Sequence, residues 1–148
     1  MSRKILPPTY CFTFLVAAIA LHLILPVSRI IPSPYNLSGI VLVVLGIWIM
    51  VWADSLFKKS NTEVKPFDKP AILVTNGPFR VSRHPMYVGF VGLLLGVAML
   101  LGSLIAFVAP VAMFITLATI FIPFEEDMCQ KVFDEAYSDY KTCVRKWL

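Results

Sequence analysis

The feature that most limits how this chain can fold is a near-continuous apolar stretch over residues 87–124. A helix crosses a bilayer with about 20 residues, so this stretch is too long for one crossing. The pair Gly102 and Ser103 interrupts the stretch and predicts a tight hairpin between two spans. Two further apolar segments precede it. We therefore expect four transmembrane helices, over residues 10–26, 37–57, 86–102 and 104–124.

The composition agrees with a membrane protein. Of the 148 residues, 58% are hydrophobic and only 15% are charged, and the mean hydropathy is +0.79. A soluble domain of this size would carry more charge. We expect an all-α polytopic fold forming a single domain over residues 1–148. The apolar stretch near the N-terminus has no small-residue cleavage site after it, so we expect it to be a retained first span.

Lysine and arginine residues predict the orientation. They precede the first span, fill the loop over residues 58–85 and follow the fourth span, whereas Arg29 stands alone on the opposite side. Positive residues favour the cytoplasmic face. Both termini and the loop are therefore expected to be cytoplasmic.

The tail over residues 125–148 has apolar residues at three- and four-residue steps, which predicts an amphipathic helix. Such a helix can lie on the membrane or fold back over the loop. We expect it to fold back and cover a cytoplasmic pocket.

The stretch "RHPMY" could bind an anion. Arg83 and His84 precede Pro85, and proline suits the first turn of a helix, so the third span is expected to start there. The N–H groups of a first turn favour a carboxylate or phosphate. The alternative is ordinary positive flanking of a span, with the arginine side chains reaching the headgroups.

An acidic pair, Glu125 and Glu126, directly follows the last apolar segment. Carboxylates at a membrane boundary are costly unless they are solvated or paired. A hairpin between the last two spans would bring both near Arg83 and His84. The alternative is a plain end of the span with a salt bridge to Arg83.

Small residues predict how the spans pack. Gly89, Gly92 and Gly96 share a face of the third span, which allows close helix packing or a smooth wall for a lipid tail. His22, inside the first span, is expected to hydrogen-bond another helix rather than relay protons.

The sequence does not support a disulfide framework, a nucleotide-binding loop or a metal site. The three cysteines have no close spacing, and we expect unpaired thiols. No glycine-rich nucleotide loop and no His/Cys cluster with metal spacing occur. We expect neither a metal nor a nucleic-acid partner.

Together these motifs resemble a known family. "LVTNGPFRVSRHPMYVG", an apolar hairpin, "EE", a spaced "F-x-x-x-Y-x-x-Y" and the basic end "VRKWL" are similar to the isoprenylcysteine carboxyl methyltransferase family. The related phospholipid methyltransferases share the RHP-x-Y and EE elements. The resemblance covers roughly residues 58–148.

The resemblance implies S-adenosylmethionine as methyl donor and a lipophilic small-molecule acceptor. It implies cofactor contacts from the loop and the third and fourth spans, at Leu73, Val74, Phe79, His84, Pro85, Tyr87 and Glu125. In that assignment Glu125 holds the methionyl end of the cofactor. Arg83, Glu126 and Arg145 are assigned to the catalytic group.

The acceptor is less constrained. Members that methylate prenylcysteine carry an arginine four residues before the acidic residue, where this chain has Phe121. A carboxylate acceptor would need another cation, such as Arg145 or Arg80. The alternatives are a phospholipid amine methyltransferase, a non-enzymatic protein that binds lipid headgroups, and a reductase related to sterol reductases, which are much longer chains.

Overall fold

The computed structural model describes residues 6–25, 29–59 and 72–148, and this part of the chain is helical without a strand. Only two isolated β-bridges occur in it, Arg29 with Ser103 and Ser82 with Arg145. The predicted all-α fold is confirmed. The α- and π-helices are α1 (Pro7–Ile24), α2 (Gly39–Lys59), α3 (Pro85–Leu101), α4 (Val108–Thr116), a π-helical turn (Leu117–Phe121) and α5 (Ile122–Cys143).

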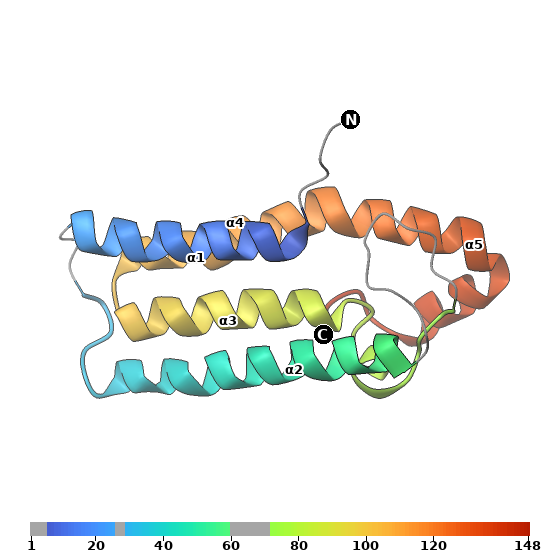
Figure 1. Ribbon diagram of the computed structural model, residues 1–148, viewed down its shortest axis with the longest axis horizontal. Helices are drawn as coiled ribbons and strands as arrows, with labels where there is room; N and C mark the ends of the chain where they lie inside the picture. Colours follow the sequence, from blue (N-terminus) through green and yellow to red (C-terminus); the bar gives the residue numbers. More distant parts are fainter. Residues whose placement is uncertain (1–5, 26–28, 60–71) are drawn as a thin grey trace.

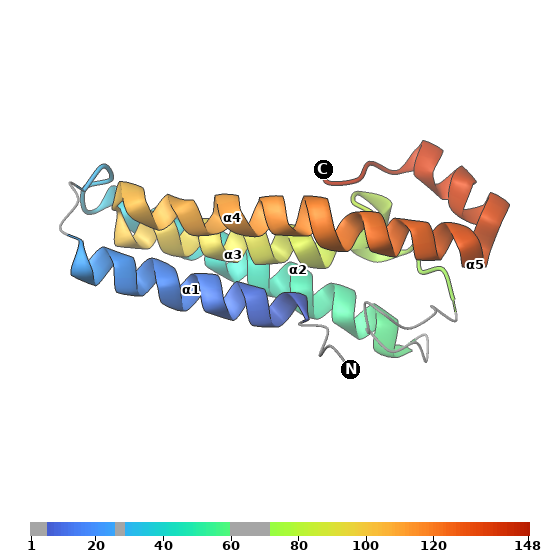
Figure 2. The same ribbon diagram turned by 90° about the horizontal axis from the view of Figure 1, so that it is seen from above.

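The helices run along one long axis. α1 and α4 lie together, α2 and α3 form the other pair, and α5 continues from α4 beyond the end of the bundle (Figures 1 and 2). The far part of α5 turns back, and the C-terminus lies near the start of α3 (Figure 1). One end of the bundle therefore gathers the start of α3, the start of α5 and the C-terminal residues.

Glycines set the close contact between α2 and α3. A Cβ on Gly96 would lie 2.6 Å from the carbonyl oxygen of Gly39, and one on Gly89 would lie 2.7 Å from that of Gly46. By contrast, the nearest atom to a Cβ on Gly92 is 3.9 Å away. Two of the three α3 glycines are therefore needed for packing against α2, as the small-residue face predicted.

The hairpin between α3 and α4 forms where it was predicted. Gly102 ends α3 with φ 68°, a left-handed conformation that suits glycine, and its N–H donates to Ala98. The hydroxyl of Ser103 shares a hydrogen bond of 2.9 Å with the Nδ1 atom of His22, and the tautomer of His22 decides which group donates. His22 was expected to hydrogen-bond another helix; its partner Ser103 lies instead in the turn between α3 and α4, so the bond ties α1 to the hairpin.

Among the described residues, three helical stretches are long and apolar enough to cross a membrane: Pro7–Ile24, Tyr35–Lys59 and Leu104–Cys143. The four predicted spans are thus matched in part. α3 is also apolar but has 17 residues. At about 1.5 Å per residue these reach about 25 Å, against a hydrocarbon core of about 30 Å. α1 and α2 expose large apolar side chains outward, Phe12, Leu23 and Trp48 among them. Such faces suit lipid.

The tail differs in detail from the prediction. The helix that begins as α4 runs without a break into α5, so no separate helix begins at residue 125. The reversal comes at Asp134, whose φ of 42° and ψ of −109° are not helical. The helix ends at Cys143, and the last five residues, 144–148, are not helical. These five residues are called the C-terminal strap below.

The predicted loop over residues 58–85 lies only partly within the described residues, because 60–71 fall outside them. Arg3 and Lys4, which supported the orientation, also lie outside. At the start of the loop, Lys58 forms an ion pair of 2.5 Å with Asp54 one turn earlier in α2.

Candidate functional site

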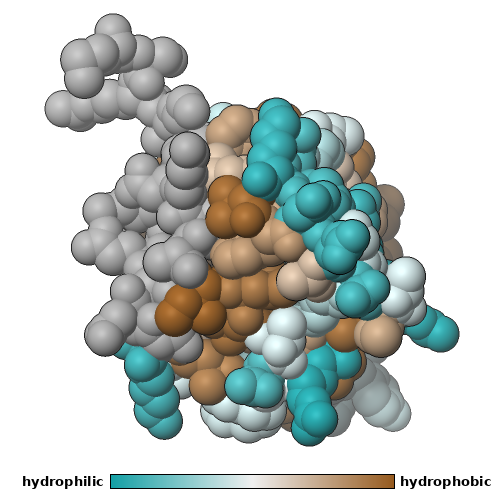
Figure 3. Space-filling model, turned by 90° about the vertical axis from the view of Figure 1, so that its right-hand side faces the viewer, coloured by the Kyte–Doolittle hydropathy of each residue, from teal (hydrophilic) through white to brown (hydrophobic). Residues whose placement is uncertain are grey.

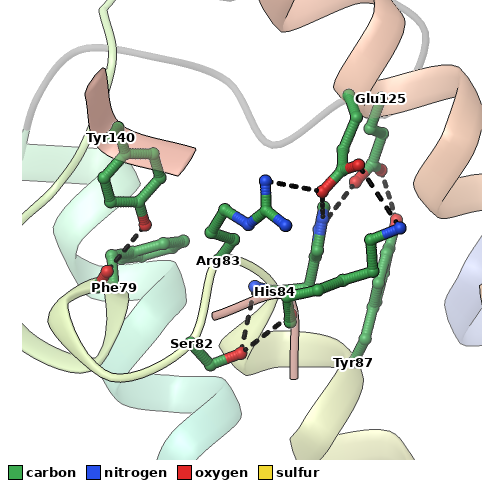
Figure 4. Close-up of polar contacts among 9 residues, drawn as sticks. Phe79, Ser82, Arg83, His84, Tyr87, Glu125 and Tyr140 are labelled. Carbon is green, nitrogen blue, oxygen red and sulfur yellow. Dashed lines mark hydrogen bonds and ion pairs between the residues drawn. The ribbon is translucent and has the colours of Figure 1, made fainter. Parts of the chain in front are cut away.

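The site is built around the start of α3. Pro85 occupies the first position of the helix, where its missing N–H is not needed, and His84 is the N-cap. The chain enters through a short 3₁₀ turn, Gly77–Arg80, whose first residue has φ 61°. This entry directs the side chains of Arg83 and His84 toward α5 (Figure 4).

The two carboxylates at the start of α5 meet the imidazole of His84. Its Nδ1 atom lies 3.5 Å from Oε2 of Glu125, and its Nε2 atom lies 3.5 Å from Oε1 of Glu126. Nη1 of Arg83 lies 3.2 Å from the same oxygen of Glu126. The prediction that the RHP stretch lies near the acidic pair is confirmed: His84 and Glu126 are in contact although they are 42 residues apart in the sequence.

Tyr87 completes the first turn of α3. Its hydroxyl donates a short hydrogen bond to Oε1 of Glu125. Its ring stacks on the His84 imidazole, with 5.5 Å between the ring centroids and planes 6° apart. The imidazole is therefore held between an aromatic face and two carboxylates (Figure 4).

The two carboxylates are not equivalent. Glu126 faces three cationic groups: Arg83, His84 and Lys146, whose Nζ atom lies 3.5 Å from Oε2. Within the part of the chain that the structure describes, no lysine or arginine pairs with Glu125. Glu126 is thus the centre of an internal ion network, whereas the cationic group that the described residues bring to Glu125 is His84.

The electrostatics of the cluster follow from this arrangement. Burial lowers the pKa of His84, but hydrogen bonds and charge from Glu125 and Glu126 outweigh it, and the pKa is raised from 6.5. Burial raises the pKa of Glu126, but the His84 hydrogen bond and the charges of Arg83 and Lys146 bring it down to about 2. At neutral pH Glu126 is therefore a carboxylate that accepts hydrogen bonds and is a poor base.

Arg83 is unusually buried for an arginine, with a side chain 10% exposed. Its Nε and Nη1 atoms are buried and make no hydrogen bond within the described residues, although Nη1 lies at ion-pair distance from Glu126. The guanidinium thus pairs its charge with Glu126 but keeps unused donor capacity.

Beside the charged cluster lies a small apolar one. Val74 and Phe79 are buried against Ala53 of α2, and the Phe79 ring meets Phe57 edge-on at 5.1 Å. The carbonyl of Phe79 accepts a hydrogen bond of 2.6 Å from the Tyr140 hydroxyl. The returning part of α5 is thereby fixed to the loop, as the fold-back prediction required.

Leu73 and Arg145, both predicted site residues, place their side chains in neither the charged cluster nor the apolar one. Leu73 is half-buried next to Val74 and has no contact of its own with the carboxylates that the structure records. The Arg145 side chain is exposed, and the residue joins the site through its backbone, whose carbonyl accepts a hydrogen bond of 2.9 Å from the Arg83 N–H.

The sequence prediction missed two residues, Ser82 and Lys146. Ser82 is 2% exposed and accepts a hydrogen bond of 3.2 Å from the His84 N–H. A serine two residues before a helix N-cap can bond in this way, and this local signal could have identified it. Lys146 could not have been found, since its contact with Glu126 depends on the path of the C-terminal strap.

The end of the molecule that carries the site is mixed in character. Apolar side chains gather in the middle of this face and hydrophilic ones border them (Figure 3). Within the described residues no group of three His, Cys, Asp or Glu side chains could hold a metal ion. The arrangement suits an organic ligand that carries both a cationic and an anionic group.

The fold and site together define a helical integral membrane protein with a buried ionic cluster at one end of its bundle. Comparison with known families narrows this class: the sequence profile described as phospholipid methyltransferase matches residues 35–136. That range covers more than half of the chain and contains the RHP stretch and both glutamates. The chain belongs to the phospholipid methyltransferase family. No curated protein and no solved structure matched it.

Proposed function

We propose that the chain is a four-span membrane methyltransferase that uses S-adenosylmethionine to methylate a small lipophilic acceptor. Residues 1–148 act as one domain, with both termini and the site on the cytoplasmic side. The observation that carries this proposal is the convergence of His84 and Tyr87 with Glu125 at the end of the bundle. Family membership supports methyl transfer as the reaction class.

The residues present fit the charges of the cofactor. Its methionyl end carries an ammonium and a carboxylate. Glu125 suits the ammonium, because no described lysine or arginine neutralises it. The start of α3, where His84 is the N-cap, suits the carboxylate, because helix N-termini favour anions. The ring nitrogens of His84 themselves face Glu125 and Glu126. Leu73, Val74, Phe79 and Tyr87 would contribute the apolar and aromatic contacts.

When bound, the cofactor supplies an electrophilic methyl group on a sulfonium. The chain's own residues then have to align the acceptor in line with that methyl group and exclude water. Arg83 and Glu126 act by holding His84 in place through their ion pairs. Both ring nitrogens of His84 face carboxylates. The imidazole is therefore suited to binding and orientation rather than to removing a proton from the acceptor.

A phospholipid amine is the second candidate for the acceptor, and one observation favours it over a prenylcysteine carboxylate. Phe121 is 3% exposed and meets the ring of Tyr10 edge-on, with 5.6 Å between the centroids. An apolar contact thus fills the position at which a carboxylate-reading arginine is expected. A carboxylate acceptor would depend on Arg145 or Arg80 instead.

Calorimetric binding of S-adenosylhomocysteine to the detergent-purified protein, beside the variant His84→Ala, tests the donor site. We expect the wild type to bind and the folded variant to lose binding. Wild-type affinity in the variant would refute the assignment of His84. No binding by a folded wild type would favour the alternative of a lipid-headgroup protein.

Acceptor assays then follow with two substrates. Methyl transfer from the labelled cofactor to phosphatidylethanolamine, and none to a prenylcysteine, would support the phospholipid amine. The opposite result would show that another cation takes over the role of the arginine that Phe121 replaces.

A further inference from the structure

The C-terminal strap, residues 144–148, lies against the residues that precede α3. The carbonyl of Arg145 accepts a hydrogen bond of 2.9 Å from the Arg83 N–H, and Lys146 pairs with Glu126 at 3.5 Å. Further along, the Trp147 ring packs on Phe114 of α4, with 4.7 Å between the centroids. The strap thus contacts the ionic cluster through Arg145 and Lys146 and contacts α4 through Trp147.

Ser82 lies where the strap and the cluster meet. Its hydroxyl oxygen accepts from the His84 N–H at 3.2 Å and donates a long hydrogen bond of 3.4 Å to the carbonyl of Lys146 (Figure 4). A hydroxyl has one proton and two lone pairs, so it can make both bonds at once. Ser82 is 2% exposed, and water cannot readily replace either partner.

Hydrogen bonds fix the backbone on the C-terminal side of Ser82. The N–H of Arg83 is bonded to the strap, and the N–H of His84 is bonded to Ser82. Movement of the strap therefore pulls on two successive peptide groups of the RHP stretch. The orientation of the His84 imidazole depends on these same peptide groups.

We infer that Ser82 is a positioning residue, whose hydroxyl couples docking of the C-terminal strap to the orientation of His84. This inference rests on the proposed function for its effect on cofactor affinity. Its effect on the strap can be measured without any ligand. In this arrangement the strap has to be docked for His84 to meet both carboxylates.

Ser103 offers a matched control. It is as buried as Ser82, at 1% exposure, and its hydroxyl is also hydrogen-bonded, to His22 at 2.9 Å. It lies in the hairpin between α3 and α4, at the other end of the bundle. Loss of a buried serine hydroxyl should cost stability at both positions, whereas only Ser82 should affect the strap.

The experiment uses the full chain with Trp48→Phe and Trp52→Phe, which leaves Trp147 as the single tryptophan of the three. Acrylamide quenching of Trp147 reports whether the strap is docked, and calorimetry with S-adenosylhomocysteine reports affinity. We expect Ser82→Ala to increase quenching and to weaken affinity about tenfold, since an unpaired buried group costs that order of free energy. Ser103→Ala should do neither, and Ser82→Thr should restore the docked strap.

Unchanged quenching in folded Ser82→Ala, or equal quenching in the Ser82→Ala and Ser103→Ala variants, would overturn the inference. Increased quenching with unchanged affinity would also overturn it, because the strap would then move without affecting His84. If the wild type binds no S-adenosylhomocysteine, the proposed function fails. The quenching comparison still decides in that case whether Ser82 holds the strap.

Discussion

Glu125→Gln and Glu126→Gln should have different consequences, although the two residues are adjacent. Glu125 has no lysine or arginine partner within the described residues and is the proposed partner of the cofactor's ammonium. A hydrogen bond to a charged group contributes about 1.5–3 kcal/mol. Glu125→Gln should therefore weaken binding of S-adenosylhomocysteine by roughly 10- to 150-fold.

Glu126→Gln should mainly lower stability. The pKa of Glu126 falls from 4.5 to about 2 in the folded protein, and its side chain is 13% exposed. At about 1.4 kcal/mol per unit this shift corresponds to at most about 3 kcal/mol, and solvent screening reduces it to about 2 kcal/mol. For a chain of this length the melting temperature should fall by roughly 4–8 °C.

Calorimetry and thermal unfolding of the wild type and both variants in one detergent provide the test. The stability that Glu126 contributes is present above pH 4.5 and is lost as the pH falls toward about 2, so neutral pH reports it in full. A larger loss of affinity in Glu126→Gln than in Glu125→Gln, with no loss of stability, would refute the reasoning. The carboxylates would then have exchanged roles.

Three further predictions concern packing, pH and the tail. Gly96→Ala should destabilise the protein by about 1–3 kcal/mol, because its Cβ would lie 2.6 Å from a backbone oxygen, whereas Gly92→Ala should be tolerated in the same thermal unfolding assay. The stability contributed by His84 should be complete below pH 6.5 and should decline as the pH rises through the higher pKa of the folded state. Melting temperatures measured over a pH series should show this decline in the wild type and not in His84→Gln. Tyr140→Phe should lower stability by about 1 kcal/mol through loss of its 2.6 Å hydrogen bond, and unchanged melting would show that the fold-back does not need it.

Much of the site could be predicted because it follows from connectivity. A hairpin at Gly102 returns the chain to the end from which α3 started, so residues before α3 and after α4 must meet. Arg83 and His84 therefore had to lie near Glu125 and Glu126 once the hairpin was recognised. The amphipathic pattern of the tail likewise required a surface on which to bury Tyr137 and Tyr140, which are 3% and 8% exposed.

The contacts of the strap could not be predicted in the same way. They are hydrogen bonds to backbone carbonyls of the strap, between residues about 60 positions apart, and one ion pair between Lys146 and Glu126. Every residue has the same backbone carbonyl, so the sequence does not indicate which carbonyl accepts a hydrogen bond. The sequence also does not indicate which of several lysines in a basic tail pairs with Glu126. The chain reversal at Asp134 could not be predicted either, because aspartate is only one of several residues that tolerate positive φ.

The π-helical turn Leu117–Phe121 decides how the predicted acidic pair is presented. Pro123 has no N–H, so an uninterrupted α-helix would leave the carbonyl of Thr119 without its usual donor four residues later. The wider turn, in which the Ile122 N–H donates to Leu117 five residues earlier, admits one extra residue ahead of the proline. One residue rotates everything that follows by about 100°, since a helix turns once in about 3.6 residues. The side of the helix on which Glu125 and Glu126 emerge therefore depends on this turn, and it faces His84 rather than lipid.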